Sequence, residues 1–394
     1  MALIEQYQLR RYEIRKRRHK QIIVLITAIL AVAAIFVVYF TVNLILHKSY
    51  TSYEVIHKQE RKDSSSAKYE RYGSGIIRYS RDGAMAMDSA GNLLWNGTFE
   101  MNDPILDVQG KYAVVSDRGS TTLEIFNGEG KMTTVNVANP IIKSEIASQG
   151  VVAVLMDGDG VNYISLYSEE GEKLVDSRTV NEKDGFPLDM SLSEDGRKLV
   201  TSYLTIGDGK VQSVITFFNF GDVGQNYVDK KVGGAFNFGQ AIVPRIEFVN
   251  NNTVCAFGDN GFRIYSIEQT PKEIYKETFQ SEIKSIFYSD KYVGFVLNNG
   301  EGANKYHLLL YDLNGKVVLD KGINYEYDNV FISGEEIILY SNLEWIIVRT
   351  NGQMKFHYTF DTEISFILPV NNIDKYIIID NENMEEVKLT EKSK

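Results

Sequence analysis

The feature that most constrains the fold of this chain is a hairpin that recurs about every 40 residues. Each unit has an apolar or aromatic strand, a polar turn that usually contains glycine, and a second strand. The best-placed turn glycines are Gly91, Gly130 and Gly171, spaced by 39 and 41 residues, and Gly315 and Gly352, which are 37 residues apart. The eight hairpins lie at residues 85–99, 123–137, 164–178, 215–229, 262–279, 308–322, 345–360 and 376–389. A repeat of this length is typical of the blades of a β-propeller.

Further short apolar segments between the hairpins, at 111–117, 150–157 and 335–341, raise each unit to three or four strands. No long amphipathic helix follows residue 50, which argues against a sheet built from βαβ units. We therefore expect an all-β protein, a β-propeller of about eight blades. The last hairpin lacks a clear fourth strand, so seven blades are the alternative and the mode of ring closure stays open.

A second feature precedes the repeats. Residues 22–46, IIVLITAILAVAAIFVVYFTVNLIL, hold 25 residues without a charged side chain. A helix of that length is about 37 Å long, whereas the hydrocarbon core of a bilayer is about 30 Å thick. This predicts a transmembrane helix at residues 21–46. A cleaved signal peptide ending near Ala31-Val32-Ala33 is the alternative, but the apolar run continues well past that site.

Basic residues indicate the orientation of this helix. Residues 1–20 carry seven Lys and Arg, whereas residues 47–56 carry only Lys48. Cytoplasmic flanks of membrane helices are enriched in Lys and Arg, so we expect residues 1–20 to be a basic cytoplasmic tail. Residues 47–68 are polar and are interpreted as a spacer, followed by an extracytoplasmic propeller at residues 69–394.

The part of the chain after residue 20 is acidic, with 35 basic against 50 acidic side chains and a net charge of −15. Such a charge disfavours nucleic acids and other anionic polymers as partners. Cys255 is the only cysteine, so no intrachain disulfide can form. An exported domain without disulfides fits a bacterial cell envelope, and the context TVCAFGD predicts that Cys255 is buried.

One hairpin carries a more specific pattern. The stretch AMDSAGNLLW, residues 86–95, resembles the tryptophan-docking motif of quinoprotein-like propellers. The resemblance implies that Ala86 lets neighbouring sheets approach, that Asp88 and Gly91 form the turn, and that Trp95 packs flat against the next blade.

The same pattern also occurs in propellers that bind a quinone cofactor. Here the match is one residue shorter than the full motif, has Ala90 where a threonine is usual, and occurs in one unit of eight. A quinone site would also need stacking tryptophans and calcium-ligating acids, but the chain has only Trp95 and Trp345. We interpret the motif as structural and expect no cofactor.

Most of the chain resembles a family of bacterial proteins of unknown function that have a basic N-terminus, one membrane helix and an extracytoplasmic propeller. The resemblance rests on IIRYSRDG (76–83), GFPLDMSLSEDGRKLVTSYL (185–204) and ITFFNFGDVGQ (215–225), and on the order of the units. It implies the fold and the topology, but it carries over no catalytic residues.

Candidate chemical groups are sparse. His307 and His357 are the only histidines of the expected propeller, and surface or core positions explain them better than a metal pair. The sequence Asp157-Gly158-Asp159-Gly160 resembles the start of a calcium loop, but Val161 follows and no glutamate closes the loop, so a plain hairpin is favoured. We expect no metal site and no catalytic residue.

Three functions are compatible with these observations. The first is a non-enzymatic interaction or scaffolding platform in the bacterial cell envelope, anchored in the membrane through residues 22–46 and bound to an envelope protein or a wall component. The second is a sensor for a ligand or glycan. The third is a hydrolase or lyase that uses carboxylates in the propeller channel. Acids clustered in the channel would favour the third function.

Overall fold

A computed structural model describes residues 2–61, 67–207, 209–300, 302–371 and 373–391. Residues 62–66 of the predicted spacer and residues 392–394 of the predicted propeller lie outside the described residues. The chain divides into two units, residues 1–49 and residues 50–394. The first contains helix α1 (Ala2–Leu46), which includes both the basic segment and the apolar run. Within it, Arg15–Phe40 is long and apolar enough to cross a membrane.

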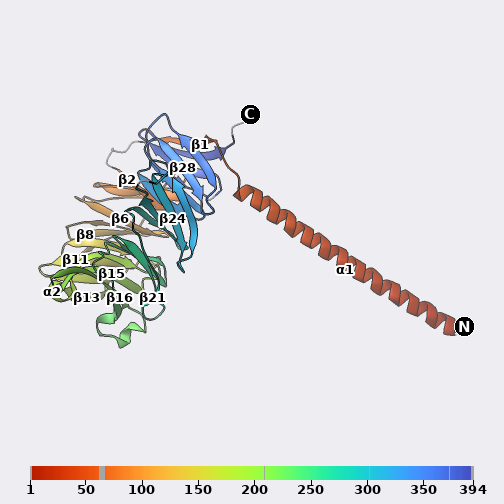
Figure 1. The fold of residues 1–394 in the computed structure, drawn as a ribbon, viewed down its shortest axis with the longest axis horizontal. Coiled ribbons are helices and arrows are strands. Elements are labelled where there is room, and N and C mark those ends of the chain that lie inside the picture. The colour runs from red at the N-terminus through yellow and green to blue at the C-terminus, as the bar shows by residue number, and fades with distance from the viewer. Residues whose placement is uncertain (1, 62–66, 208, 301, 372, 392–394) are drawn as a thin grey trace. The chain divides into compact units, whose positions relative to one another are not determined.

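The second unit consists of eight four-stranded antiparallel sheets, so the prediction of an all-β propeller is confirmed with eight blades rather than seven (Figure 1). Each blade contains four strands that are consecutive around the ring. Blades 1 to 4 comprise β2 (Lys68–Tyr72), β3 (Gly75–Ser80), β4 (Gly83–Met87), β5 (Leu93–Thr98); β6 (Pro104–Gln109), β7 (Tyr112–Asp117), β8 (Thr122–Phe126), β9 (Met132–Asn136); β10 (Ile141–Ile146), β11 (Val152–Gly158), β12 (Val161–Tyr167), β13 (Lys173–Val180); and β14 (Phe186–Leu192), β15 (Lys198–Gly207), β16 (Lys210–Asn219), β17 (Lys231–Ala235).

Blades 5 to 8 continue the same order. They comprise β18 (Arg245–Asn250), β19 (Thr253–Gly258), β20 (Gly261–Ser266), β21 (Lys272–Thr278); β22 (Ile283–Tyr288), β23 (Tyr292–Asn298), β24 (Tyr306–Asp312), β25 (Val317–Ile323); β26 (Asn329–Ser333), β27 (Glu336–Tyr340), β28 (Glu344–Arg349), β29 (Met354–Thr359); and β30 (Ile364–Pro369), β31 (Lys375–Asp380), β32 (Asn383–Thr390), β1 (Ser52–Glu60). A short helix, α2 (Asn181–Asp184), precedes blade 4, and two single 3₁₀ turns, η1 (Gly224–Asn226) and η2 (Val228–Lys230), delay its fourth strand beyond the predicted hairpin.

Strand β1 corrects the predicted spacer and settles how the ring closes. It pairs antiparallel with β32, from Ser52 opposite Thr390 to Glu60 opposite Asn383, and so supplies the fourth strand of blade 8. In Figure 1 it is labelled beside the blue C-terminal strands. The predicted last hairpin therefore forms the second and third strands of its blade. An outermost strand is exposed along most of its length, so its sequence can be polar enough to resemble a linker.

Apolar side chains fill the seams between blades. The described residues form eight buried clusters, and each joins two successive blades. The cluster between blades 8 and 1 contains Ile76 together with Leu368, Ile377, Ile379 and Met384, which closes the ring. First strands of successive blades approach one another, as β14 and β18 do, so the first strand of each blade lines the central channel.

The seam between blades 7 and 8 also contains a buried polar group. Lys355 of β29 and Glu336 of β27 form an ion pair, and Lys355 Nζ lies 2.9 Å from the hydroxyl of Tyr376 on β31. The Tyr376 hydroxyl donates to Glu336 Oε2 at 2.5 Å. All three side chains are nearly inaccessible to solvent. The backbone N–H of Tyr50, which begins the propeller unit, donates to the carbonyl of Lys355 at 2.8 Å.

Candidate functional site

The structure places the predicted docking residues at the seam between blades 1 and 2. Ala86 of β4 is directly opposite Trp95 of β5, and both are buried. The Trp95 ring stacks on Phe126 of blade 2 with ring centroids 4.7 Å apart and an interplanar angle of 8°. Its Nε1 donates to the Tyr72 hydroxyl at 3.1 Å, which in turn donates to the carbonyl of Lys111 at 2.8 Å. Trp95 therefore contacts the next blade by both stacking and hydrogen bonding.

Asp88 and Gly91 form the turn that precedes this contact. The Asp88 carboxylate accepts the backbone N–H groups of Ala90 and Asn92 at 2.9 and 2.8 Å. Gly91 donates its N–H to the Asp88 carbonyl at 3.1 Å and has a φ of +86°, a conformation that favours glycine. These bonds fix the direction in which β5 leaves the turn.

The same joint recurs at seams where the sequence shows no tryptophan. A Cβ added to Gly130 would lie 2.3 Å from Trp95 Cβ, so the turn of blade 2 presses on the outer strand of blade 1. Equivalent glycines meet the outer strand of the preceding blade at Val135, Tyr275 and Leu319, in the order Gly171, Gly315 and Gly352. Gly91 itself meets Gln59 of β1. The glycine spacing was the signal for these joints, because the residue that packs on each glycine varies.

The first strands bring together carboxylates that the sequence did not single out. Asp107 of β6 accepts the N–H of Ile146 at 2.7 Å, Glu145 of β10 accepts that of Leu192 at 2.7 Å, and Asp189 of β14 accepts that of Ile246 at 2.9 Å. In each case the donor is on the first strand of the next blade. These acids therefore join blades 2, 3, 4 and 5 beside the channel.

Two cations lie among these acids. Lys143 Nζ is 2.7 Å from both Glu145 Oε1 and Asp189 Oδ1. Arg245 is 2.7 Å from Glu247 Oε1 on β18. Burial opposes the charge on Lys143, but Glu145, Asp189 and Glu247 outweigh it and raise the lysine pKa.

Burial also raises the pKa of several of these carboxyl groups. The pKa of Asp107 rises to about 6, and those of Glu145 and Glu247 to about 7. A carboxyl group with such a pKa can exchange protons near neutral pH, which is the chemistry that a channel enzyme would use. The acids are clustered, as the enzyme hypothesis required, but three of them already hold backbone N–H groups of a neighbouring blade.

The remaining sequence candidates lie apart from one another. His307 pairs with Asp320 at 2.5 Å, and His357 pairs with Glu344 at 2.9 Å, each within its own blade. Asp157 to Gly160 form a tight hairpin, with Gly158 opposite Val161. Among the described residues no three His, Cys, Asp or Glu side chains gather in a group that could hold a metal ion. The prediction that Cys255 is buried is confirmed.

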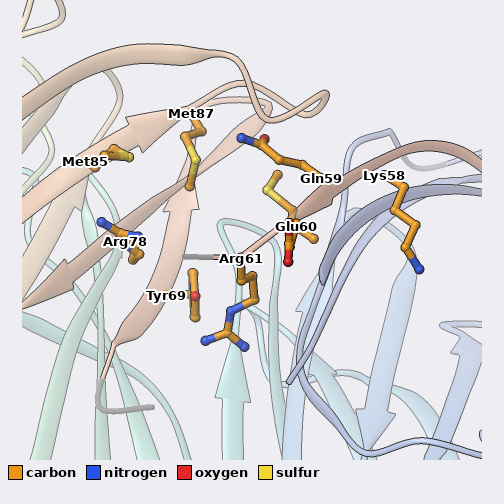
Figure 2. Close-up of a pocket in the computed structure, with 9 residues that line it drawn as sticks. Lys58, Gln59, Glu60, Arg61, Tyr69, Arg78, Met85 and Met87 are labelled. Atoms are coloured by element: carbon orange, nitrogen blue, oxygen red, sulfur yellow. The ribbon is translucent and has the colours of Figure 1, made fainter. Parts of the chain in front are cut away.

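A cavity of about 520 Å³ lies at the closing seam of the ring, where blade 8 meets blade 1 (Figure 2). Blade 8 contributes residues 58–61 at the end of β1 and just beyond it, and Met384 of β32. Blade 1 contributes Tyr69, Arg78, Met85 and Met87. Met85 and Met87 flank Ala86 on β4, so they lie on the opposite face of the strand from the docking contact. This volume is in the range of about 300–1,000 Å³ that is typical of small-molecule sites.

Blade 4 carries an exposed apolar surface. Its strands β15 and β16 have 10 residues each, against five to eight for the equivalent strands of the other blades. Near the tip of this long hairpin Ile206 is directly opposite Val211, and Leu204 is opposite Phe186 on β14. Cross-strand partners share a face of a sheet, as do residues two apart. Phe186, Leu204, Ile206 and Val211 therefore form one patch, named the blade 4 patch, in which Ile206 is 74% exposed and Phe186 56%.

The fold defines the protein as an eight-bladed β-propeller that follows an apolar helix long enough to cross a membrane. Residues 46–389 match a family of unknown function, DUF5711, and the chain belongs to that family. No curated protein matches the sequence.

Solved structures share the fold at low sequence identity. A eukaryotic initiation factor is 12% identical with a TM-score of 0.55, over 87% of this chain and 88% of that one. Apo AztD from Citrobacter koseri is 11% identical with a TM-score of 0.54, over 75% of this chain and 87% of that one. Dipeptidyl peptidase 4 of Porphyromonas gingivalis is 12% identical with a TM-score of 0.53, over 80% of this chain and 56% of that one. At these identities the likeness establishes the propeller fold alone.

Proposed function

We propose that this protein is a membrane-anchored docking platform in the bacterial cell envelope, with residues 1–20 in the cytoplasm and the propeller outside. The observation that carries this proposal is the blade 4 patch, in which large apolar side chains are exposed together on one face of a sheet. Contiguous exposed apolar surface of this kind marks interaction sites in soluble domains.

The position of the patch favours a protein partner. The blades repeat by rotation about the channel, so equivalent turns fall on the same face of the ring. The chain enters the propeller at the start of β1, on the face that carries turns such as Asp88–Asn92, whereas the tip of the β15–β16 hairpin is on the opposite face. The patch is thus directed away from the tether. A net charge of −15 after residue 20 disfavours anionic wall polymers.

The partner is tested by crosslinking in intact cells. Replacing Ile206 by Glu in the full-length protein places a charge at the centre of the docking surface, and we expect the yield of crosslinked envelope protein to fall at least tenfold. The matched control is Leu174→Glu, which changes an exposed leucine on the outer strand of blade 3. Equal yields from both variants would remove the blade 4 patch from the proposal. Crosslinking to glycan strands instead of protein would make the partner a wall polymer.

The topology is tested with a membrane-impermeant thiol reagent. Cys255 is fully buried and should stay unlabelled, so the wild-type chain is the background. We expect Glu170→Cys, in an exposed turn of blade 3, to be labelled in intact cells, and Arg10→Cys to be labelled only after lysis. Labelling of the residue 10 variant in intact cells would reverse the orientation.

The non-enzymatic part of the proposal concerns the channel acids. Asp107, Glu145 and Asp189 hold the backbone of the next blade, and Lys143 neutralises part of their charge. We infer that their role is to join blades. Turnover of a glycan by the purified protein, lost on replacing Glu145 and Glu247 by Gln while the fold is retained, would instead establish a hydrolase or lyase.

A further inference from the structure

The closing seam has the smallest buried core of the eight seams. Among the described residues its cluster has five buried apolar side chains, whereas the other seven clusters have nine to thirteen. The cavity of about 520 Å³ lies at this same seam. Elsewhere in the ring, neighbouring blades fill the space between them with their own side chains. At this seam the blades leave room for a further molecule.

The apolar wall of the cavity is formed by thioethers. Met85 and Met87 of blade 1 face the space from one side, and Met384 of blade 8 contributes the other side (Figure 2). Methionine side chains are unbranched and polarisable, so they adapt to apolar groups of different shapes. The ring of Tyr69 adds an aromatic surface, and Arg61 lies over that ring with its guanidinium carbon 5.3 Å from the ring centroid.

Cationic groups lie on the same walls. Arg61 donates to the carbonyl of Asp380, a neutral partner, and Arg78 lines the cavity from β3. Lys58 pairs with Glu385 at 2.8 Å, and Glu60 is the carboxylate among the lining residues. Two guanidinium groups therefore face one carboxylate, in a propeller that is otherwise strongly acidic. Guanidinium groups match the geometry of carboxylates, sulfonates and phosphates.

We propose that this cavity binds a small amphipathic organic anion, whose apolar body packs on the three methionines and whose anionic group is bound by Arg61 and Arg78. The two arginines also argue against the alternative reading of the thioethers as ligands for a soft cation such as Cu(I). A bound molecule contacts β1 and blade 1 together, so it stabilises the closed ring. Because β1 is the strand that follows α1, occupancy fixes the end of the propeller that is joined to the membrane helix.

The test uses octanoate as the probe, with octan-1-ol and octylammonium as neutral and cationic probes of equal chain length. The full-length protein, labelled with carbon-13 in its methionine methyl groups, is studied by NMR in nanodiscs. We expect octanoate to shift the resonances of Met85, Met87 and Met384 saturably, with at least tenfold higher affinity than octan-1-ol and no saturable shift from octylammonium. The three resonances are assigned by Met→Leu variants.

The arginine contribution is tested with Arg78→Gln, which should weaken octanoate binding about tenfold and leave octan-1-ol unchanged. Arg118→Gln, at an exposed ion pair on blade 2, is the control and should bind as the wild type does. Equal affinities for octanoate and octan-1-ol would contradict the anion site. So would equal shifts of methionines outside the seam, or a Cu(I) response of the same three methyl groups without an octanoate response. None of these outcomes depends on the blade 4 patch.

Discussion

Replacing Trp95 by Ala should lower the free energy of unfolding of the propeller by about 3–5 kcal/mol, the range measured for truncation of large buried aromatic side chains. Trp95 is 5% exposed, stacks on Phe126 and lies against Gly130. The substitution therefore opens a cavity between blades 1 and 2 and also removes the hydrogen bond to Tyr72. The measurement is urea unfolding of the full-length protein in nanodiscs, followed by far-ultraviolet circular dichroism.

Leu94→Ala is the matched control for this experiment. Leu94 precedes Trp95 on the same strand but is 53% exposed, so its loss should change stability by no more than about 0.5 kcal/mol. Loss of a bound chromophore from the Trp95 variant at unchanged stability would contradict the structural role of the motif and support a cofactor role.

Replacing Lys355 by Met should destabilise the protein by a similar amount, about 3–5 kcal/mol, because it leaves the Glu336 carboxylate buried without its cation. Burial lowers the pKa of Lys355 and raises that of Glu336, and each partner opposes the shift of the other. The hydroxyl of Tyr376 remains as a donor to Glu336, but a neutral hydrogen bond does not balance a buried charge. Stability is again measured by urea unfolding.

The double variant Glu336→Leu with Lys355→Met separates loss of the pair from exposure of one member. Apolar replacement of both partners of a buried ion pair is often neutral or stabilising, so we expect the double variant to be more stable than Lys355→Met alone. If Lys355→Met unfolds at the wild-type urea concentration, then Glu336 is already protonated in the native state and the ion pair is not what holds this seam.

The sequence predicted the parts of the fold that repeat. Turn glycines such as Gly130 and Gly315 need a positive φ in every blade where they occur, so their spacing gave the period of the ring. Strand β1 was missed because its partner β32 lies more than 300 residues away along the chain and has no counterpart in local sequence. An outermost strand also needs only one partly buried edge, and most residues of β1 are exposed.

The candidate sites were harder to predict for a related reason. Asp107, Glu145 and Asp189 are about 40 residues apart and meet only because consecutive blades place their first strands side by side. In an acidic chain such residues do not stand out from the many surface carboxylates. The cavity at the closing seam could not be predicted, since one of its walls belongs to the strand that was taken for a spacer.

Closure of the ring by β1 also imposes an order of assembly. During synthesis this strand emerges directly after α1, but its partner β32 is made more than 300 residues later. At about 5–20 residues per second, translation leaves β1 without its partner for about 15–65 s. Through this interval the edge of β1 and the side of blade 1 around Ile76 stay open to other chains. The first strand to be made is therefore the last to be paired, and the nascent propeller depends on protection from edge-to-edge association until its final blade arrives.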